Sequence, residues 1–537
     1  MSEREEGIRS AGGRTARAMG VWLFVFLCCV YLLTLRGRPR GGDEWTMLSV
    51  AVMLVETGSV AFPQDVQLTG GTAGDEHVQY SKFPVGQSLA IVPFYMAGRL
   101  VGEGLARSEA GPMFYVRRET IGVLFAGLLP VLATAGAAWG VFQLCRGLKK
   151  TDRASVWGGI LYGLGTMAFA YSGSLLSEPL QALSLVLGVW IAIRGARSNS
   201  WRWMIVCGLC LGLAAVKPNL LVVAVPVLAY SLLTSDGRMR GRMARCALCV
   251  LGIVPGLAAA LVYNWVRFGN VFAFGYAGEP FRWRWDVSIP GYLVSPGRSV
   301  FLYSPVLILA IFGARRLLRR CRAEVLLLLS IAGVVVLLYA SWWEWTGGWC
   351  WGPRFLLPII GLMMPMVVEG WETLRARGKR WVRWGAVVLV VCSILVQVPG
   401  VAIDPLNYHD ILHRTEWEPL VKGLVDDVGV FAPHFSPLMG NAWLLKWALV
   451  RAVRAEKVTA EAMLRDAPWA SARPAWRPEV PVEYAWPQVW YMSYREQAPG
   501  VGPVAVVVYL IVCASGATAS GILLWRAARG RRNAVQG

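Results

Sequence analysis

The sequence lacks the signatures by which soluble enzymes hold nucleotides. It contains no phosphate-binding loop of the form G-x-x-x-x-G-K-[ST], no strand-linked G-x-G-x-x-G, and no D-x-D motif to hold a nucleotide-sugar diphosphate through a metal ion. These absences argue against a cytosolic nucleotide as the direct substrate. Charge is also scarce, because only 16% of the 537 residues are charged and 56% are hydrophobic. This composition excludes a set of soluble modules and predicts a polytopic membrane protein.

The charge that is present is mostly basic, with a formal net charge of +20. The basic residues form short clusters between apolar runs and no single patch, so nucleic acid is not an expected partner. Their expected partner is the anionic inner leaflet of a lipid bilayer, and we predict a multi-pass protein of the plasma (inner) membrane.

The eleven cysteines do not indicate a metal site or a disulfide framework. Cys207-x-x-Cys210 and Cys246-x-x-Cys249 have the spacing of zinc ligands, but both pairs lie within or beside apolar helices. Thiolate ligands need polar support and charge compensation, so we interpret these cysteines as small packing residues of membrane helices.

Twelve apolar segments are interpreted as membrane-spanning helices, so the predicted fold class is an all-α polytopic membrane protein. Three segments carry two glycines four residues apart, which favours close helix packing: Gly159/Gly163, Gly208/Gly212 and Gly252/Gly256. The first segment follows a basic tail without a small-x-small cleavage site, so we expect it to be retained as a span. The twelve are residues 21–35, 120–144, 155–171, 179–195, 203–216, 218–233, 246–266, 299–314, 324–340, 354–369, 384–402 and 502–525.

One further apolar stretch, residues 85–101, decides which way the loops face. If it spans the membrane, four basic clusters between later spans face outward. If it lies in the outer interface or re-enters, all four clusters and both termini are cytoplasmic. Pro93 and Gly98 interrupt the stretch, so we predict the second arrangement, with interfacial helices at the outer face.

This topology divides the chain into four regions. We predict a cytoplasmic basic tail at 1–20 and a transmembrane catalytic module at 21–403, whose first outer loop is 36–119. An outer-face segment or small cap domain follows at 404–501, and a last transmembrane helix with a basic cytoplasmic tail occupies 502–537. The cations of Arg36-Gly37-Arg38-Pro39-Arg40 lie on the outer side, against the usual bias, and a nearby anionic ligand would explain them.

Two adjacent acids, Asp43 and Glu44, follow the first span directly. A carboxylate at the edge of a bilayer is costly unless it is solvated, paired or used in function. An ordinary solvated loop is the other interpretation of this pair, and local sequence does not decide between the two.

The other predicted outer loops combine aromatic residues with single charges. Residues 341–354 contain five tryptophans, which form either an interfacial belt or the wall of a groove in which Gly347 and Gly348 allow close backbone approach and Arg354 reaches an anion. Lys82 could be solvated or could neutralise a lipid phosphate. Glu178 could favour a helix N-terminus or face the same cavity as Asp43.

Three of the four histidines, His409, His413 and His434, lie in the 404–501 segment. His409 and His413 have the i, i+4 spacing of metal ligands, but no HExxH context and no third ligand accompany them. We interpret them as interfacial polar residues and predict no metal ligand here.

Six motifs, taken in order, resemble the GT-C superfamily of integral-membrane glycosyltransferases, particularly bacterial aminoarabinose transferases and protein O-mannosyltransferases. The resemblance covers most of residues 20–400. Gly42-Asp43-Glu44 alone would be a weak signal, whereas the ordered set is more specific. The others are Tyr80 to Gly86, Ser177-Glu178-Pro179, Tyr263-Asn264-x-x-Arg267-Phe268-Gly269, Ser295 to Arg298 with Tyr303-Ser304-Pro305, and Trp349 to Phe355.

The resemblance implies a sugar donor on a polyprenyl phosphate, used at the outer face in an inverting transfer to an acceptor hydroxyl. The acceptor could be a lipid, a glycan or a protein. Some members of the superfamily use a divalent metal and others do not, so no cofactor is assigned.

The resemblance also implies roles for particular residues. Asp43 would be the general base, and Glu44 would orient substrate or share that role. Lys82 and Arg354 would bind phosphate, and Glu178 matches an acidic position of the second outer loop. Arg298 and Tyr263 match motifs without a defined role.

A transporter or flippase of a lipid-linked or amphiphilic substrate is the alternative hypothesis. It predicts internal pseudo-symmetry and polar groups near the membrane midplane. The second half of the sequence does not repeat the first, and the acids cluster at the predicted outer edge.

Overall fold

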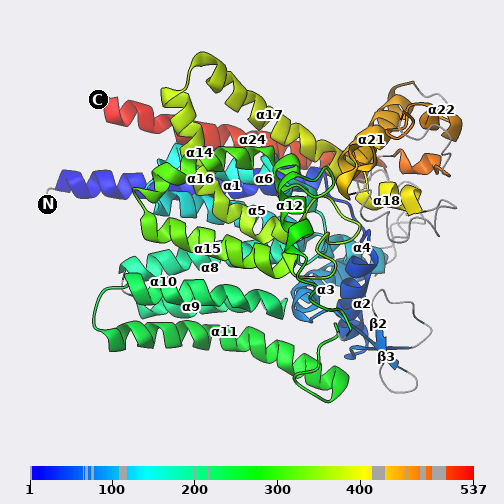
Figure 1. Ribbon diagram of the computed structural model, residues 1–537, viewed down its shortest axis with the longest axis horizontal. Coiled ribbons are helices and arrows are strands. Elements are labelled where there is room, and N and C mark those ends of the chain that lie inside the picture. The colour runs from blue at the N-terminus through cyan, green and yellow to red at the C-terminus, as the bar shows by residue number, and fades with distance from the viewer. Residues whose placement is uncertain are drawn as a thin grey trace.

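Most of the chain folds into long helices that lie side by side in one bundle (Figure 1). Helix α1 (Glu3–Leu33) begins, and α24 (Pro503–Gln536) ends, at the same end of the bundle. Helices α2 (Gly42–Glu56) and α3 (Gly86–Arg107) lie at the opposite end, together with a small sheet (Figure 1). The structure is a computed structural model and describes residues 3–63, 66, 71–73, 78–107, 118–198, 200–213, 217–276, 278–413, 430–454, 458–471, 479–486 and 503–536.

The helices follow the predicted apolar segments closely, although their bounds differ. The others are α4 (Arg118–Ala126), α5 (Leu128–Gly147), α6 (Asp152–Gly165), α7 (Ala168–Tyr171), α8 (Glu178–Ser198), α9 (Trp201–Leu213), η3 (Pro218–Val223), α10 (Ala224–Thr234), α11 (Met239–Phe268), α12 (Trp285–Val294), α13 (Val300–Tyr303), η4 (Pro305–Leu307), α14 (Ile308–Leu318), α15 (Arg322–Ala340), η5 (Arg354–Leu356), α16 (Leu357–Arg377), α17 (Arg380–Ala402), α18 (Pro405–His413), η6 (Pro433–Phe435), α21 (Pro437–Arg454), α22 (Ala460–Arg465) and η7 (Val482–Tyr484).

Eight helical segments in the described part of the chain are long and apolar enough to cross a membrane. The prediction of a polytopic, helical membrane protein is therefore confirmed, but the count of twelve spans is not. The four remaining segments are short or broken: α6 and α7 are separate helices, α9 is short, η3 precedes α10, and Pro305 separates α13 from α14. The eight are Arg14–Leu33, Thr120–Gly147, Glu178–Ser198, Met239–Phe268, Arg322–Ala340, Arg354–Ala376, Arg380–Ala402 and Val506–Arg529.

Helices α9 and α11 pack backbone against backbone, as their paired glycines predict. A Cβ atom on Gly208 would lie 2.0 Å from the carbonyl oxygen of Cys249, and one on Gly256 would lie 2.2 Å from that of Gly212. Only glycine fits at this distance, so the small-residue spacing is confirmed as a packing device. Cys207 and Cys249 are buried in the same contact as free thiols, in agreement with their interpretation as packing residues.

A small antiparallel sheet at the α2 end was not predicted. It consists of β1 (Ala61–Pro63), β2 (Gly71–Ala73) and β3 (Val78–Ser81), in the order β1-β3-β2. The sheet directs the chain after β3 toward the end of the bundle, where Lys82 follows Ser81. Helix α3 next to it contains Pro93, packs against α2 and α4, and is not among the eight candidate spans.

The described part of 404–501 has an apolar core of its own. Tyr408, Trp443 and Trp469 are buried together there, on and around helices α18, α21 and α22. Figure 1 shows these helices at the same end of the bundle as α2 and the sheet. This region therefore stands beside the place where the predicted site residues gather.

Candidate functional site

A cavity of about 570 Å³ opens among segments that are far apart in the sequence. Its lining includes five of the seven predicted site residues: Asp43, Glu44, Lys82, Glu178 and Arg354. They come from the first turn of α2, the end of β3, the start of α8 and the segment before α16. The structure thus brings together four segments that the sequence motifs had singled out separately.

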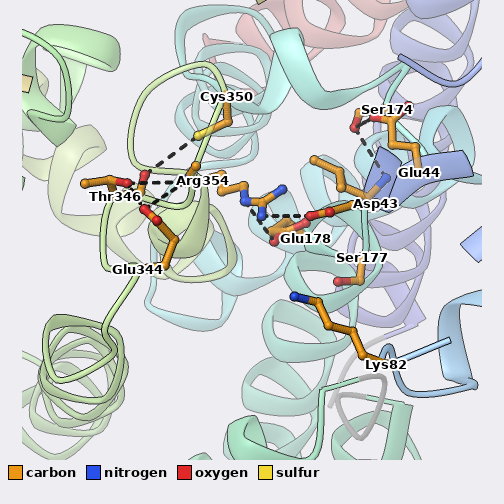
Figure 2. Close-up of polar contacts among 12 residues, drawn as sticks. Asp43, Glu44, Lys82, Ser174, Ser177, Glu178, Glu344, Thr346, Cys350 and Arg354 are labelled. Carbon is orange, nitrogen blue, oxygen red and sulfur yellow. Dashed lines mark hydrogen bonds and ion pairs between the residues drawn. The ribbon is translucent and has the colours of Figure 1, made fainter. Parts of the chain in front are cut away.

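Arg354 lies between two carboxylates in this cavity (Figure 2). Its Nη2 is 3.0 Å from Asp43 Oδ2, and its Nε is 4.0 Å from Glu178 Oε1. Both acids stand in the first turn of a helix, where the partial positive charge of the N-terminus stabilises a carboxylate. Asp43 keeps 27% of its side chain exposed, so it can meet a substrate, whereas Glu178 is only 1% exposed.

Lys217 also pairs with Glu178, which the sequence analysis missed. Its Nζ lies 2.8 Å from Glu178 Oε1, and the ammonium stands 4.8 Å from the centre of the Phe355 ring. A buried carboxylate needs such compensation, because an unpaired charge out of water is costly. The available signal was a single lysine between two apolar runs, which by itself marks a functional candidate in a membrane segment.

Glu44 lines the cavity but is largely buried and held by two hydrogen bonds within the protein. It is 4% exposed, accepts a hydrogen bond from the Ser174 hydroxyl, and accepts another at Oε2 from the Arg40 backbone N–H at 3.0 Å. Burial raises the pKa of the Glu44 carboxyl above its ordinary value of 4.5, although Arg36 and Ser174 oppose the shift. The contacts of Glu44 join the first turn of α2 to Arg40 just before it and to Ser174.

Lys82 reaches the same cavity from the sheet. Its Nζ lies 2.7 Å from Oε1 of Glu279, a residue of the segment that follows α11. Tyr276 from that segment also lines the cavity. Burial, followed by the charge of Asp43, raises the pKa of the Tyr276 hydroxyl, so this phenol is neutral.

The tryptophan-rich segment 341–354 forms one wall of the cavity. Trp342, Trp343 and Trp349 line it, and Trp349 stacks on His409 with 5.9 Å between the ring centres. Gly347 and Gly348 have φ of 80° and 69°, a backbone conformation that favours glycine. The groove-wall interpretation of this segment is therefore supported by its position.

Arg298 and Tyr263 do not line this cavity. Arg298 is buried beneath the wall, where its Nη2 donates to the Gly348 carbonyl at 2.7 Å and supports the glycine turn. Tyr263 lines a second cavity of about 550 Å³, bounded mainly by apolar residues of α2, α3 and α11. The structure therefore does not bring these two residues together with Arg354 and Asp43.

Arg36 and Arg40 line the cavity and also make contacts that hold its surrounding segments together. Arg36 Nη2 donates to the carbonyls of Ala170 and Gly400, at 2.7 and 3.0 Å. Arg40 Nε lies 3.5 Å from Asp404 Oδ2, and burial lowers the pKa of its guanidinium to about 9. The two arginines thus connect the start of α2 to the segment around residue 400.

The two carboxylates nearest Arg354 are already paired with a cation. Asp43 and Glu178 have a guanidinium between them, and the described residues contain no group of three His, Cys, Asp or Glu side chains that could hold a metal ion. His409 is stacked on Trp349, and the side chain of His413 lies outside the described residues.

Comparison with solved structures finds similarity over almost the whole chain. Two crystal structures of ArnT, an aminoarabinose transferase, from Cupriavidus metallidurans match 97% of this chain and 78% of that chain, with TM-scores of 0.45. The apo structure shares 16% sequence identity, and the structure bound to undecaprenyl phosphate shares 17%. The Archaeoglobus fulgidus oligosaccharyltransferase matches 88% of this chain and 61% of its own, with 11% identity and a TM-score of 0.39.

These solved proteins are GT-C glycosyltransferases, the class that the ordered sequence motifs resemble. No protein-family model and no curated protein matches the sequence. The fold and the cavity themselves define a multi-pass helical membrane protein with a site in which carboxylates and cations are paired.

Proposed function

We propose that this protein is a membrane glycosyltransferase that moves a sugar from a polyprenyl-phosphate carrier to an acceptor hydroxyl, with inversion at the sugar carbon. The observation that carries the proposal is the position of Arg354 between Asp43 and Glu178 in a cavity that Lys82 also enters. A base and two phosphate-binding cations are the groups that this chemistry needs.

In the proposed reaction the acceptor hydroxyl gives its proton to Asp43. The acceptor oxygen forms a bond to the anomeric carbon while the bond from that carbon to the phosphate oxygen breaks. The electron pair of the broken bond stays on the phosphate, which leaves as polyprenyl phosphate. Attack opposite the leaving group inverts the anomeric carbon.

Arg354 has two tasks in this scheme. It orients Asp43 through the 3.0 Å contact, and its remaining N–H groups stabilise the charge that develops on the phosphate. Glu178 holds Arg354 in place, and Lys217 in turn pairs with Glu178. The cations supply the charge compensation that a divalent metal would otherwise give, so we propose a reaction that proceeds in the presence of a chelator.

The arrangement of the bundle supports a site at the outer face of the plasma membrane, with cytoplasmic termini. Helices α1 and α24 lead to the chain ends at one end of the bundle, and the elements that surround the cavity lie at the other (Figure 1). Polyprenyl carriers present their phosphate at the membrane surface, where Lys82 and the tryptophan-rich wall would meet it.

The test is transfer by the purified protein in sealed proteoliposomes, with radiolabelled polyprenyl-phosphate sugars and extracted envelope material as acceptor. The proposal predicts label in a new glycoside together with free polyprenyl phosphate, in the presence of EDTA. Movement of intact donor across the bilayer without cleavage would contradict it and would favour a flippase.

A further inference from the structure

Lys82 already has an anionic partner at the cavity. Its Nζ lies 2.7 Å from Glu279 Oε1, with the two side chains 23% and 21% exposed. The same ammonium stands 5.5 Å from the ring centre of Tyr276 and 5.6 Å from that of Phe83. Cation–π contacts of this kind favour one position of a flexible lysine. The segment after α11 thus holds the lysine at the cavity.

Glu279 is itself fixed by a second contact. Its Oε2 accepts a hydrogen bond from Trp343 Nε1 at 3.0 Å, and Trp343 belongs to the tryptophan-rich wall. The Glu279 carboxylate, in the segment after α11, therefore contacts both Lys82, which follows β3, and Trp343 of the tryptophan-rich wall. The chain around it is also tightly packed, because a Cβ atom on Gly275 would lie 2.4 Å from the Lys82 carbonyl oxygen.

We propose that Glu279 is a displaceable counter-ion that positions Lys82 and sets the affinity of the site for a phosphate group. The inference rests on the proposed function, in which Lys82 binds the phosphate of the donor. A phosphate that reaches Lys82 has to replace Glu279, and the two anions repel each other if both remain. Glu279 is a positioning residue and takes no part in bond formation.

Exchange of the phosphate for the Glu279 carboxylate at Lys82 would help polyprenyl phosphate, the product, to leave the site. A sugar phosphodiester brings one negative charge to Lys82, the same charge that Glu279 supplies when the donor is absent. After transfer, Glu279 returns to Lys82 and competes with the polyprenyl phosphate that remains. Without Glu279, both donor and product bind more tightly, and product leaves more slowly.

The test measures binding of undecaprenyl phosphate to the full-length protein in detergent micelles. Intrinsic tryptophan fluorescence is the readout, because Trp342, Trp343 and Trp349 line the cavity. Glu279→Gln keeps an acceptor for Trp343 and removes the charge. We expect it to bind undecaprenyl phosphate about fivefold more tightly, the factor that corresponds to loss of a partly exposed ion pair. Asp286→Asn, which removes a 73% exposed carboxylate in the first turn of α12, is the matched control and leaves binding unchanged.

A second background distinguishes exchange at Lys82 from a general effect of charge. In Lys82→Met protein, Glu279→Gln has no further effect on undecaprenyl phosphate binding, because the exchange partner is gone. In the transfer assay, Glu279→Gln lowers the donor KM and strengthens inhibition by undecaprenyl phosphate about fivefold, and Glu279→Asp restores both. Equal or weaker binding by Glu279→Gln, or the same gain in the Lys82→Met background, overturns the inference. Absence of undecaprenyl phosphate binding by the wild-type protein counts against the proposed function itself.

Discussion

Arg354 and Asp43 are 311 residues apart in the sequence, yet Arg354 Nη2 lies 3.0 Å from Asp43 Oδ2. The pair joins the start of α2 to the segment that enters α16. On the other side of the same guanidinium, Arg354 Nε lies 4.0 Å from Glu178 Oε1. A planar guanidinium can bridge two carboxylates, whereas a lysine ammonium is a single point charge.

Replacement of Arg354 by lysine tests whether this geometry matters. We expect Arg354→Lys to lower kcat/KM for transfer about 100-fold, because one charge remains but the bridge and the stabilisation of the phosphate are lost. Steady-state transfer kinetics measure the effect. Arg465→Lys, at an exposed position of helix α22, is the control and keeps normal kinetics. Wild-type kinetics in Arg354→Lys protein would refute the role of the bridge.

Lys217 has a measurable effect on stability. Lys217→Met leaves the buried Glu178 carboxylate with only the more distant Arg354, so we expect a loss of about 3 kcal/mol of unfolding free energy. The residual folded fraction after heating in detergent reports the change. The double variant Lys217→Met/Glu178→Gln should recover much of the loss, because no uncompensated charge remains. Equal stability of the single and double variants would contradict this account.

Glu44 predicts a pH dependence of stability. Its pKa is higher in the folded protein than its ordinary value of 4.5, so between those two values the folded state binds more protons than the unfolded state. Stability therefore falls as pH rises through that window. Glu44→Gln removes this ionisation and should flatten the fall just above pH 4.5, as measured by thermal unfolding at several pH values. A steeper fall in the variant would show that the sign is wrong.

The contact between α9 and α11 predicts a steric effect. Gly208→Ala places a Cβ where only 2.0 Å separates it from the Cys249 carbonyl oxygen, so we expect a loss of about 1–3 kcal/mol through overpacking. Gly333→Ala, in α15 with nothing within 4 Å of the added atom, is the matched control and should be neutral or slightly stabilising. Thermal unfolding of the two variants decides the matter. Similar stability of the Gly208→Ala and Gly333→Ala variants would contradict this prediction, because α9 and α11 would then move apart with no loss of unfolding free energy.

The sequence predicted the helical membrane fold, both ends of the contacts that Arg354 makes with Asp43 and Glu178, and one end of the pairs that Lys82 forms with Glu279 and Glu178 forms with Lys217. Asp43, Lys82, Glu178 and Arg354 could be found because each stands beside a recognisable break between apolar segments and in a motif of fixed order. Glu279 could not, because it meets Lys82 from 197 residues away and nothing in its own neighbourhood marks it.

The remaining differences have physical reasons as well. The count of twelve spans is not confirmed where apolar runs are divided into short helices, as at Pro305, because hydropathy alone does not register a break in the backbone. The roles of Arg298 and Glu44 depend on the direction of a side chain. The order of the motifs predicts which loop a residue belongs to. The packing of the folded protein decides whether its side chain enters the cavity or lies behind the cavity wall, as that of Arg298 does.

The most direct test of the central claim compares Asp43→Asn with wild-type protein in a single-turnover transfer from a polyprenyl-phosphate sugar, with undecaprenyl phosphate binding measured in parallel. If Asp43 is the base, its replacement lowers the transfer rate by about 10²- to 10⁴-fold while undecaprenyl phosphate still binds, and Asp286→Asn transfers at the wild-type rate. Transfer by Asp43→Asn at the wild-type rate would contradict the account.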